Sequence, residues 1–346
     1  MPKKITISPP FSFFDIFYKL NLGKNDYQLY KSGRYSLYYG LKNLLTFDSK
    51  INTIYVPTLI CPQVLIPIDK LDLNIKYYNI DKKLGIDKKY LSSVVDNKCI
   101  VMIINYFGFP SDWDFFNNIK ESSKCFLISD NCHSMFTEYN QKKIDSFGDI
   151  SFNSMRKIVP TLSGSQLFYN NINLNIHDYS DRPRNLNKSD LISILRPLKP
   201  SFITKKLGEG EQVGKYDSTK SYDNFFNISN NTNIDKVSNN IYQKYLRDEK
   251  SIRESRLNNY MAWRNFLPES DFTFFNDNSV DDKICPYVFP CVPKSEKIMK
   301  KWLTWSRKRN TVVINWGNKL DELDMDLRML LFFPVAQNFD ISTIAN

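Results

Sequence analysis

The feature that most constrains the fold of this chain is an alternation of strand-like and helix-like stretches that starts near residue 51. Residues 99–105 form a continuous apolar run, typical of a strand covered on both faces, and residues 125–129 form another. Such alternation predicts a mostly parallel sheet wrapped by helices, with ligands bound beyond the carboxyl ends of the strands. The expected strands are residues 53–57, 74–80, 99–105, 125–129, 149–152 and 165–169.

The length of 346 residues indicates one large domain and a smaller one. We predict the large domain over residues 1–235, and a linking helix with a small C-terminal domain over residues 236–346. A helix capped by Ser111 is expected over residues 112–120. Residues 171–235 show no clear periodicity and predict loops and short helices. Toward the C-terminus we expect helices over 235–266 and 295–308, strand-like segments over 287–290 and 311–315, and an apolar ending of the small domain at 331–334.

The composition argues against several classes of protein. No stretch approaches the roughly eighteen apolar residues of a membrane span, and no secretory leader is evident. The six cysteines are scattered without a CxxC pair, which predicts a reducing cytoplasm and no dedicated zinc site. The net charge is +10, but the lysines are spread along the chain, so we do not expect a nucleic-acid-binding protein. A basic surface also suits an anionic substrate.

A lysine and a carboxylate stand at the ends of two expected strands. Asp130 ends the apolar run that begins at Cys125, and Lys157 follows the expected strand 149–152. This pair suits pyridoxal phosphate (PLP), because the lysine can form the Schiff base. The carboxylate keeps the pyridine nitrogen protonated, so the ring can accept carbanion electrons. The sequence therefore predicts a PLP site built on Lys157 and Asp130.

Other polar residues fit the same cofactor. Ser32 and Gly33 open an amphipathic helix, whose N-terminus offers free N–H groups and the positive end of a dipole to a phosphate. His133 and Ser154 fall at the same strand ends as Asp130 and Lys157.

Together these segments resemble the DegT/DnrJ/EryC1/StrS sugar aminotransferases, a group of fold-type I PLP-dependent enzymes. The resemblance covers roughly residues 28 to 170, with weaker echoes toward the C-terminus. It implies an α/β fold with a mostly parallel seven-stranded sheet, a smaller C-terminal α/β domain, and a homodimer with its sites at the subunit interface. The counterparts of the family's motifs are Ser32-Gly33, Pro57, Gly108-Phe-Pro110, Asp130 to His133, Gly148-Asp149, Lys157 and Arg256 to Tyr260.

The resemblance implies a role for each matched residue. Lys157 would hold PLP and move protons during transamination. Asp130 would pair with the pyridine nitrogen. His133 would approach the ring hydroxyl of the cofactor or help to fix Asp130. The phosphate contacts would come from Ser32, Gly33, Arg34 and Ser154.

The chain departs from the family pattern close to the expected cofactor, as a divergent member would. Arg34 stands where threonine is usual, so a guanidinium contact would replace a hydroxyl contact. Cys61 falls near the position that often supplies an aromatic plate over the pyridine ring, which leaves Tyr35 and Phe107 as other candidates. Ser151 is a rival of Ser154 for the phosphate, because the serine of many members lies further upstream of the lysine.

The resemblance implies an aminotransferase that converts a keto group of a nucleotide-linked sugar to an amine. Glutamate would be the amino donor, and the pathway would be bacterial polysaccharide or secondary-metabolite sugar biosynthesis. One alternative is a small phosphorylated ketone as acceptor. Another is a non-catalytic PLP-fold binding or regulatory protein. Sugar dehydratases of the group typically carry histidine in place of the lysine, so Lys157 favours the aminotransferase.

Overall fold

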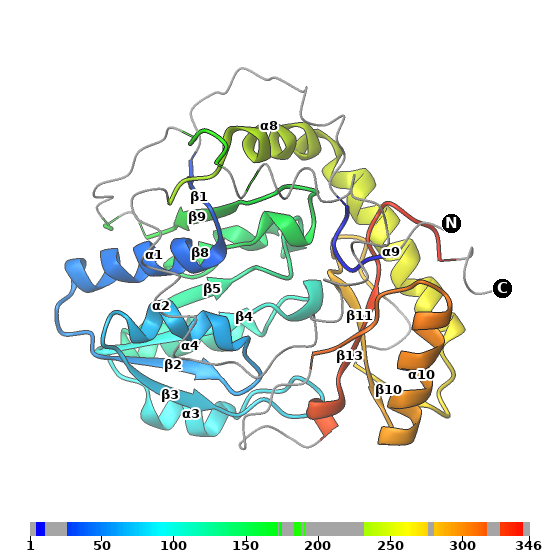
Figure 1. Cartoon of the computed structure of the whole chain (residues 1–346). Coiled ribbons are helices and arrows are strands. Elements are labelled where there is room, and N and C mark those ends of the chain that lie inside the picture. The colour runs from blue at the N-terminus through cyan, green and yellow to red at the C-terminus, as the bar shows by residue number, and fades with distance from the viewer. Residues whose placement is uncertain are drawn as a thin grey trace.

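The computed structural model describes residues 5–10, 26–171, 173–174, 183–187, 190, 232–275, 280–316 and 326–341. The described strands form a seven-stranded sheet, a four-stranded sheet that lies beside it in Figure 1, and a small two-stranded ladder of β6 (Glu138–Tyr139) and β7 (Lys142–Lys143). None of the described helices combines the length and the apolar composition that a membrane crossing needs.

The large sheet has the strand order β1-β9-β8-β5-β4-β2-β3. The five strands from β3 to β8 run parallel, whereas β9 and β1 add antiparallel at one edge. This confirms the predicted α/β fold with a mostly parallel seven-stranded sheet. The strands are β1 (Gln28–Tyr30), β2 (Thr53–Pro57), β3 (Asn74–Tyr78), β4 (Cys99–Ile104), β5 (Phe126–Asp130), β8 (Ile150–Phe152) and β9 (Ser165–Tyr169).

All six expected strands are present in the large sheet, with small differences at their ends. The expected strand 74–80 ends at Tyr78, and Ile80 instead forms an isolated bridge with Ile86. The edge strand β1 was not expected, because three residues carry too short a pattern to recognise.

Four helices accompany the large sheet: α1 (Gly33–Phe47), α2 (Leu65–Asp69), α3 (Lys88–Val94) and α4 (Trp113–Ser123). The predicted cap at Ser111 is wrong. Asp112 caps α4 by accepting a hydrogen bond from the Phe115 amide at 3.1 Å, whereas the Ser111 amide donates to the Asn105 side chain. The Asp112 carboxylate also suits the positive end of the helix dipole and pairs with Lys88.

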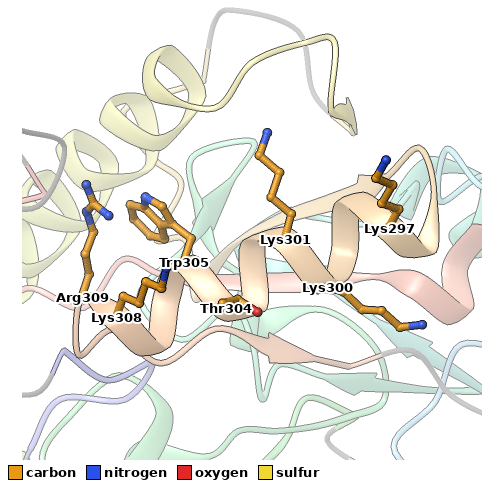
Figure 2. Close-up of a pocket in the computed structure, with 7 residues that line it drawn as sticks. All are labelled: Lys297, Lys300, Lys301, Thr304, Trp305, Lys308 and Arg309. Carbon is orange, nitrogen blue, oxygen red and sulfur yellow. The ribbon is translucent and has the colours of Figure 1, made fainter.

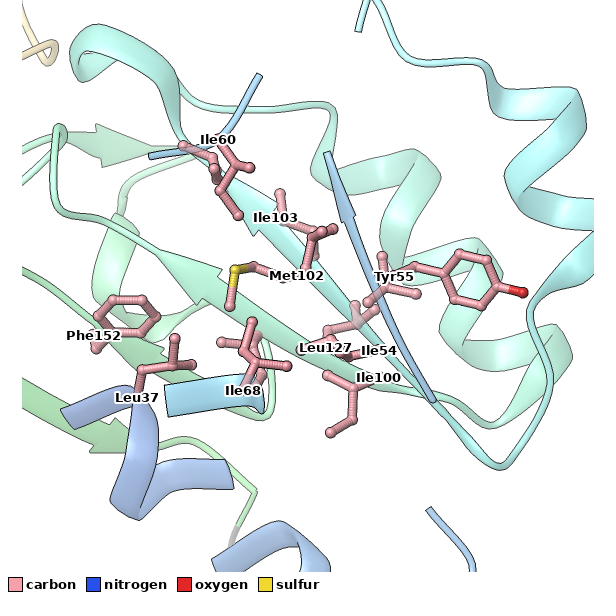
Figure 3. Packing of buried hydrophobic residues seen from close by; sticks show 14 of the residues in the cluster. Leu37, Ile54, Tyr55, Ile60, Ile68, Ile100, Met102, Ile103, Leu127 and Phe152 are labelled. Atoms are coloured by element: carbon pink, nitrogen blue, oxygen red, sulfur yellow. The ribbon is translucent and has the colours of Figure 1, made fainter. Parts of the chain in front are cut away.

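The core of the large sheet is formed by side chains of its strands and of α1 and α2. Figure 3 shows Ile54, Ile100, Met102 and Leu127 from three parallel strands, packed together with Leu37 and other apolar residues. Gly40 lets α1 approach the sheet closely, because a Cβ atom there would lie 3.2 Å from side-chain carbons of Ile150 and Leu167. This close approach brings the middle of α1 against β8 and β9.

The C-terminal part contains the second sheet, in the order β10-β11-β13-β12, with all pairs antiparallel. The expected helix over 235–266 is two helices, α8 and α9, joined by a 3₁₀ turn at Leu246–Asp248. The domain boundary at residue 235 stays a prediction. Most of residues 171–235 lie outside the described part of the chain. The elements are α8 (Lys236–Tyr245), α9 (Glu249–Phe266), β10 (Phe272–Phe274), β11 (Val288–Pro293), α10 (Glu296–Lys308), β12 (Ile314–Asn315) and β13 (Leu331–Pro334).

Candidate active site

Asp130 and Lys157 meet at one edge of the large sheet. Asp130 is the last residue of β5, which pairs in parallel with β8 so that Asp130 lies opposite Phe152. The chain leaves β8 at Phe152 and forms a 3₁₀ turn over Met155–Lys157, with Lys157 as its last residue. The predicted neighbouring strand ends are therefore present, and the two side chains interact electrostatically.

The Asp130 carboxyl group is buried and has few polar neighbours. It accepts a hydrogen bond from the Cys132 amide at 2.9 Å. Burial raises the pKa of Asp130, while the positive charge of Lys157 and the bond from Cys132 act in the opposite direction. A buried carboxylate at the floor of a site suits a protonated ring nitrogen as its partner.

The Lys157 amine lies 5.3 Å from the centre of the Tyr287 ring. Burial by itself would lower the pKa of Lys157, but interactions with Cys132, Tyr287 and Asp130 outweigh it, and the pKa is raised. Tyr287 was not recognised from the sequence, where it read only as the first residue of a strand.

The His133 imidazole is buried in a stack of aromatic rings. It lies parallel to Tyr287, with ring centres 4.8 Å apart, and to Phe107, with ring centres 5.9 Å apart. Its Nδ1 atom has no hydrogen-bond partner among the described residues. Burial and the charge of Lys157 lower its pKa well below the usual value, so the ring is neutral. Its predicted role toward the cofactor stays a prediction.

The start of α1 lies against the strand end that carries Asp130. Ser32 is the N-cap residue, but its buried hydroxyl makes no capping bond and has no partner within the described chain. A Cβ atom on Gly33 would lie 3.2 Å from Cys132 Sγ and 3.4 Å from the Asn153 carbonyl oxygen, so glycine fits this close approach. Arg34 follows on the first turn and is half-buried.

The two candidate phosphate serines have different surroundings. The Ser151 hydroxyl is buried within β8 and donates to the Asp145 carbonyl oxygen. Ser154 precedes the turn that ends at Lys157, and its side chain makes no capping bond. Its position therefore favours Ser154 over Ser151 as a ligand.

A small residue is required where the chain returns from Lys157 to β9. At Gly164 the backbone has φ +131°, and a Cβ atom would lie 2.5 Å from Met155 Sδ. The neighbouring Ser165 donates to the Asn153 carbonyl oxygen and contacts the Ser36 hydroxyl at 2.7 Å. Ser165 therefore ties β9 to α1.

Cys61 follows β2 and is the N-cap residue of the 3₁₀ turn Pro62–Val64. Its side chain is half-buried. It interacts electrostatically with both Lys157 and Cys132, so two thiols lie around the lysine amine. Of the other stacking candidates, Phe107 packs against His133, and Tyr35 is buried in the core. The residue that covers the cofactor ring stays a prediction.

These groups fit PLP by their chemistry. The cluster offers an amine, a buried carboxylate beside it, and an unpartnered buried hydroxyl at a helix N-terminus. A basic hollow on α10 is a different feature and contains none of the predicted site residues. Figure 2 shows its lining residues, which are Lys297, Lys300, Lys301, Thr304, Trp305, Lys308 and Arg309.

The model of the DegT/DnrJ/EryC1/StrS aminotransferase family matches residues 56–174, a range that includes Asp130 and Lys157. Over these residues the family resemblance is confirmed. The GDP-4-keto-6-deoxy-D-mannose 3-dehydratase of Yersinia pseudotuberculosis is 32% identical over 97 residues, which are 28% of this chain and 25% of that protein. The corresponding Escherichia coli O55:H7 protein is 31% identical over 101 residues. The chain thus spans about a quarter of the length of the curated relatives it matches.

Solved structures match over nearly the whole chain. Helicobacter pylori PseC, an aminotransferase involved in the biosynthesis of pseudoaminic acid, has a TM-score of 0.69 at 16% identity, covering 99% of this chain and 97% of that one. The E. coli GDP-4-keto-6-deoxy-D-mannose-3-dehydratase with bound hydrated PLP has a TM-score of 0.61 at 18% identity, covering 96% and 87%. At these identities the similarity shows the fold, which is that of fold-type I sugar aminotransferases. The predicted fold is thus confirmed, and the family resemblance is confirmed over residues 56–174.

Proposed function

We propose that this chain is a PLP-dependent aminotransferase that converts a keto group of a nucleotide-linked sugar to an amine. The observation that carries the proposal is the meeting of Lys157 with the buried Asp130 at the ends of two adjacent parallel strands. Family and fold support it independently, since the matched family is one of aminotransferases.

PLP, when bound, supplies an electron sink for the carbanion formed on the substrate. Lys157 is the residue to hold it covalently, and Asp130 the residue to keep its ring nitrogen protonated. Because Asp130 is buried against the backbone amide of Cys132, its carboxylate is held in one direction. Ser32, Gly33, Arg34 and Ser154 are proposed to bind the phosphate.

Lys157 is also the group proposed to move the proton during transamination. Its Nζ atom lies over the Tyr287 ring, 5.3 Å from the ring centre. As a free base, the Lys157 amine would accept a proton at the reacting carbon of the substrate and return it. His133 is neutral and stacked beside it, and so does not oppose the positive charge of the lysine.

Several details of the function belong to this proposal. Two relatives are named as acting on a GDP-linked keto-deoxysugar, which supports a nucleotide sugar as the substrate class. Glutamate is the proposed donor, and the product would enter polysaccharide or secondary-metabolite biosynthesis. We further propose a homodimer in the cytoplasm; the six free cysteines agree with a reducing compartment.

A second candidate is dehydration of a keto-sugar, because both curated relatives are named 3-dehydratases. The lysine at position 157 favours amination. Incubation with a GDP-linked 4-keto-6-deoxysugar, PLP and glutamate separates the two reactions by product mass. Amination converts the keto group of the sugar to a CH–NH2 group, so the product gains a nitrogen atom. Dehydration removes a ring hydroxyl group as water, so the product gains no nitrogen.

The cofactor is tested by the visible spectrum of the purified protein with and without added PLP. A band that disappears on borohydride reduction, with the reduced adduct mapped to Lys157, is the expected result. No band in excess PLP would contradict the proposal and favour a non-catalytic binding protein.

A further inference from the structure

Arg256, on α9, is fully buried although it carries a charge. Within the described chain it has no carboxylate at ion-pair distance. A buried guanidinium normally needs such a partner or a full set of hydrogen bonds. The hydrogen-bond partners of the Arg256 guanidinium therefore identify the segments of the chain that it stabilises.

The guanidinium donates to three separate segments of the chain. Its Nη2 atom lies 3.3 Å from the carbonyl oxygen of Lys157 and 3.5 Å from that of Ile158. Its Nη1 atom lies 3.1 Å from the carbonyl oxygen of Pro286 and 3.4 Å from that of Tyr287. Its Nε atom donates to Gln337 Oε1 at 2.8 Å.

The segment bound on one side is the end of the 3₁₀ turn that carries Lys157. Carbonyl groups at a helix C-terminus lack partners within the helix, and a cation is a favourable partner for them. Gln337 adds to this contact, because its Nε2 atom donates to the Ile158 carbonyl oxygen at 2.9 Å. Arg256 and Gln337 thus hold the same carbonyl group while bonded to each other.

The segment bound on the other side carries Tyr287. Its ring lies under the Lys157 amine and is stacked on His133. Its amide also donates to the Phe107 carbonyl oxygen at 2.8 Å. Arg256 is therefore hydrogen-bonded to the backbones of both Lys157 and Tyr287. The side chains of these two residues are in contact, with the Lys157 Nζ atom 5.3 Å from the centre of the Tyr287 ring.

We propose that Arg256, together with Gln337, is a positioning residue that fixes the Lys157 turn relative to Tyr287 and so aims the lysine amine into the site. This inference rests on the proposed function. Only arginine carries enough donors in a planar fork to reach three segments at once, so lysine is not an equivalent replacement.

The test compares Arg256→Met with Arg253→Met. Arg253 lies one turn earlier on α9 and is also buried, but it binds the Phe136 carbonyl oxygen and Glu138 and has no hydrogen bond to the Lys157 turn among the described residues. Hydrogen exchange followed by mass spectrometry is measured on the peptide that covers residues 155–161, in the protein without added PLP. We expect about tenfold faster exchange in Arg256→Met and no change in Arg253→Met.

A second readout uses the visible band formed with PLP. Its pH titration is expected to move in Arg256→Lys and to stay unchanged in Arg253→Lys. If Arg256→Met does not fold, Gln337→Leu removes the bond to Ile158 with less disturbance and should speed exchange in the same peptide.

Unchanged exchange in the 155–161 peptide of the folded Arg256 variant, or equal acceleration in both arginine variants, would overturn the inference. A failure of the proposed function would give a different result, namely the absence of a PLP band in the unsubstituted protein. The exchange comparison does not depend on PLP.

Discussion

The backbone and the side chain of Lys157 have different surroundings. The carbonyl group is bound by Arg256, whereas the amine lies among Tyr287, Asp130 and two thiols. A residue whose backbone is fixed and whose amine is free to react suits covalent catalysis. The same residue can then exchange its proton with a bound substrate without moving the chain.

We expect Lys157→Ala to abolish turnover, with a loss of at least about 10²–10⁴-fold from proton transfer alone. Some PLP binding should remain, because the groups proposed for the phosphate and the ring nitrogen are intact. Steady-state kinetics and equilibrium dialysis with PLP measure the two effects. Lys142→Ala, at an exposed strand residue, is the control. Activity that survives in Lys157→Ala would rule out the proposed mechanism.

Asp145 is a half-buried residue whose carboxyl group accepts a hydrogen bond from the Asn131 side chain at 3.0 Å. Burial raises its pKa to about 6, against the hydrogen bond from Asn131. Because the folded-state pKa lies above the unfolded value, its favourable contribution is complete at low pH. That contribution is lost as the pH rises through about 6.

We therefore expect Asp145→Asn to raise the free energy of unfolding at pH 7, by the order of 1–3 kcal/mol. The gain should vanish below about pH 3, where the carboxyl group is protonated in both states. Urea unfolding of both proteins at several pH values measures it. The asparagine keeps an oxygen acceptor for Asn131. A gain that is equal at every pH would show that titration of Asp145 is not its cause.

At the scale of elements, the N-terminus of α1 and the turn after β8 converge beside Asp130. Gly33 allows α1 to approach Cys132, and Gly40 allows it to approach β8 and β9. Gly164 lets the chain return to β9 without a clash with Met155. These glycines therefore allow the N-terminus of α1 and the turn after β8 to lie close together beside Asp130.

We expect Ser32→Ala to weaken PLP affinity by about tenfold, because its buried hydroxyl has no partner in the described chain and suits a phosphate oxygen. Stability without PLP should change little, since no capping bond is lost. Thr46→Ala, near the other end of α1, removes a hydroxyl that bonds only the Lys42 carbonyl oxygen and serves as the control. Fluorescence titration with PLP measures the affinity. Equal affinities for Ser32→Ala and Thr46→Ala would exclude Ser32 from the phosphate site.

At the scale of the whole molecule, residues from both sheets meet around Lys157. Asp130 and the Lys157 turn belong to the large sheet, whereas Tyr287 precedes β11 of the second sheet. Arg256 on α9 and Gln337 after β13 join them. A ligand bound at Lys157 is therefore expected to stabilise both parts of the fold.

PLP is expected to raise the thermal stability of the chain, since a ligand that binds only the folded state stabilises it by mass action. Free PLP at one hundred times its dissociation constant corresponds to about 2.7 kcal/mol. Thermal unfolding over a series of PLP concentrations measures this, with pyridoxine, which lacks the phosphate and aldehyde, as the control ligand. A midpoint that does not rise with PLP would contradict binding to the folded protein.

The local pattern of the sequence determined much of the large sheet. Continuous apolar runs such as residues 99–105 predict buried strands, because a strand covered on both faces has few polar positions. The polar residues that end such runs, Asp130 above all, indicate that a ligand binds at the carboxyl ends of the parallel strands. The resemblance added the number of strands, which periodicity alone does not give.

Only the tertiary structure decided which distant segments complete the site. Arg256 and Tyr287 contact Lys157 itself, and Gln337 donates a hydrogen bond to the adjacent Ile158, although the residues bonded by Arg256 and Gln337 lie 99 and 179 positions from them along the chain. Such contacts leave no local pattern, because they depend on how two sheets and α9 pack together. The helix cap of α4 also depended on the three-dimensional structure. Ser111 and Asp112 are both residues that can cap a helix, and the path of the backbone decides that Asp112 provides the cap.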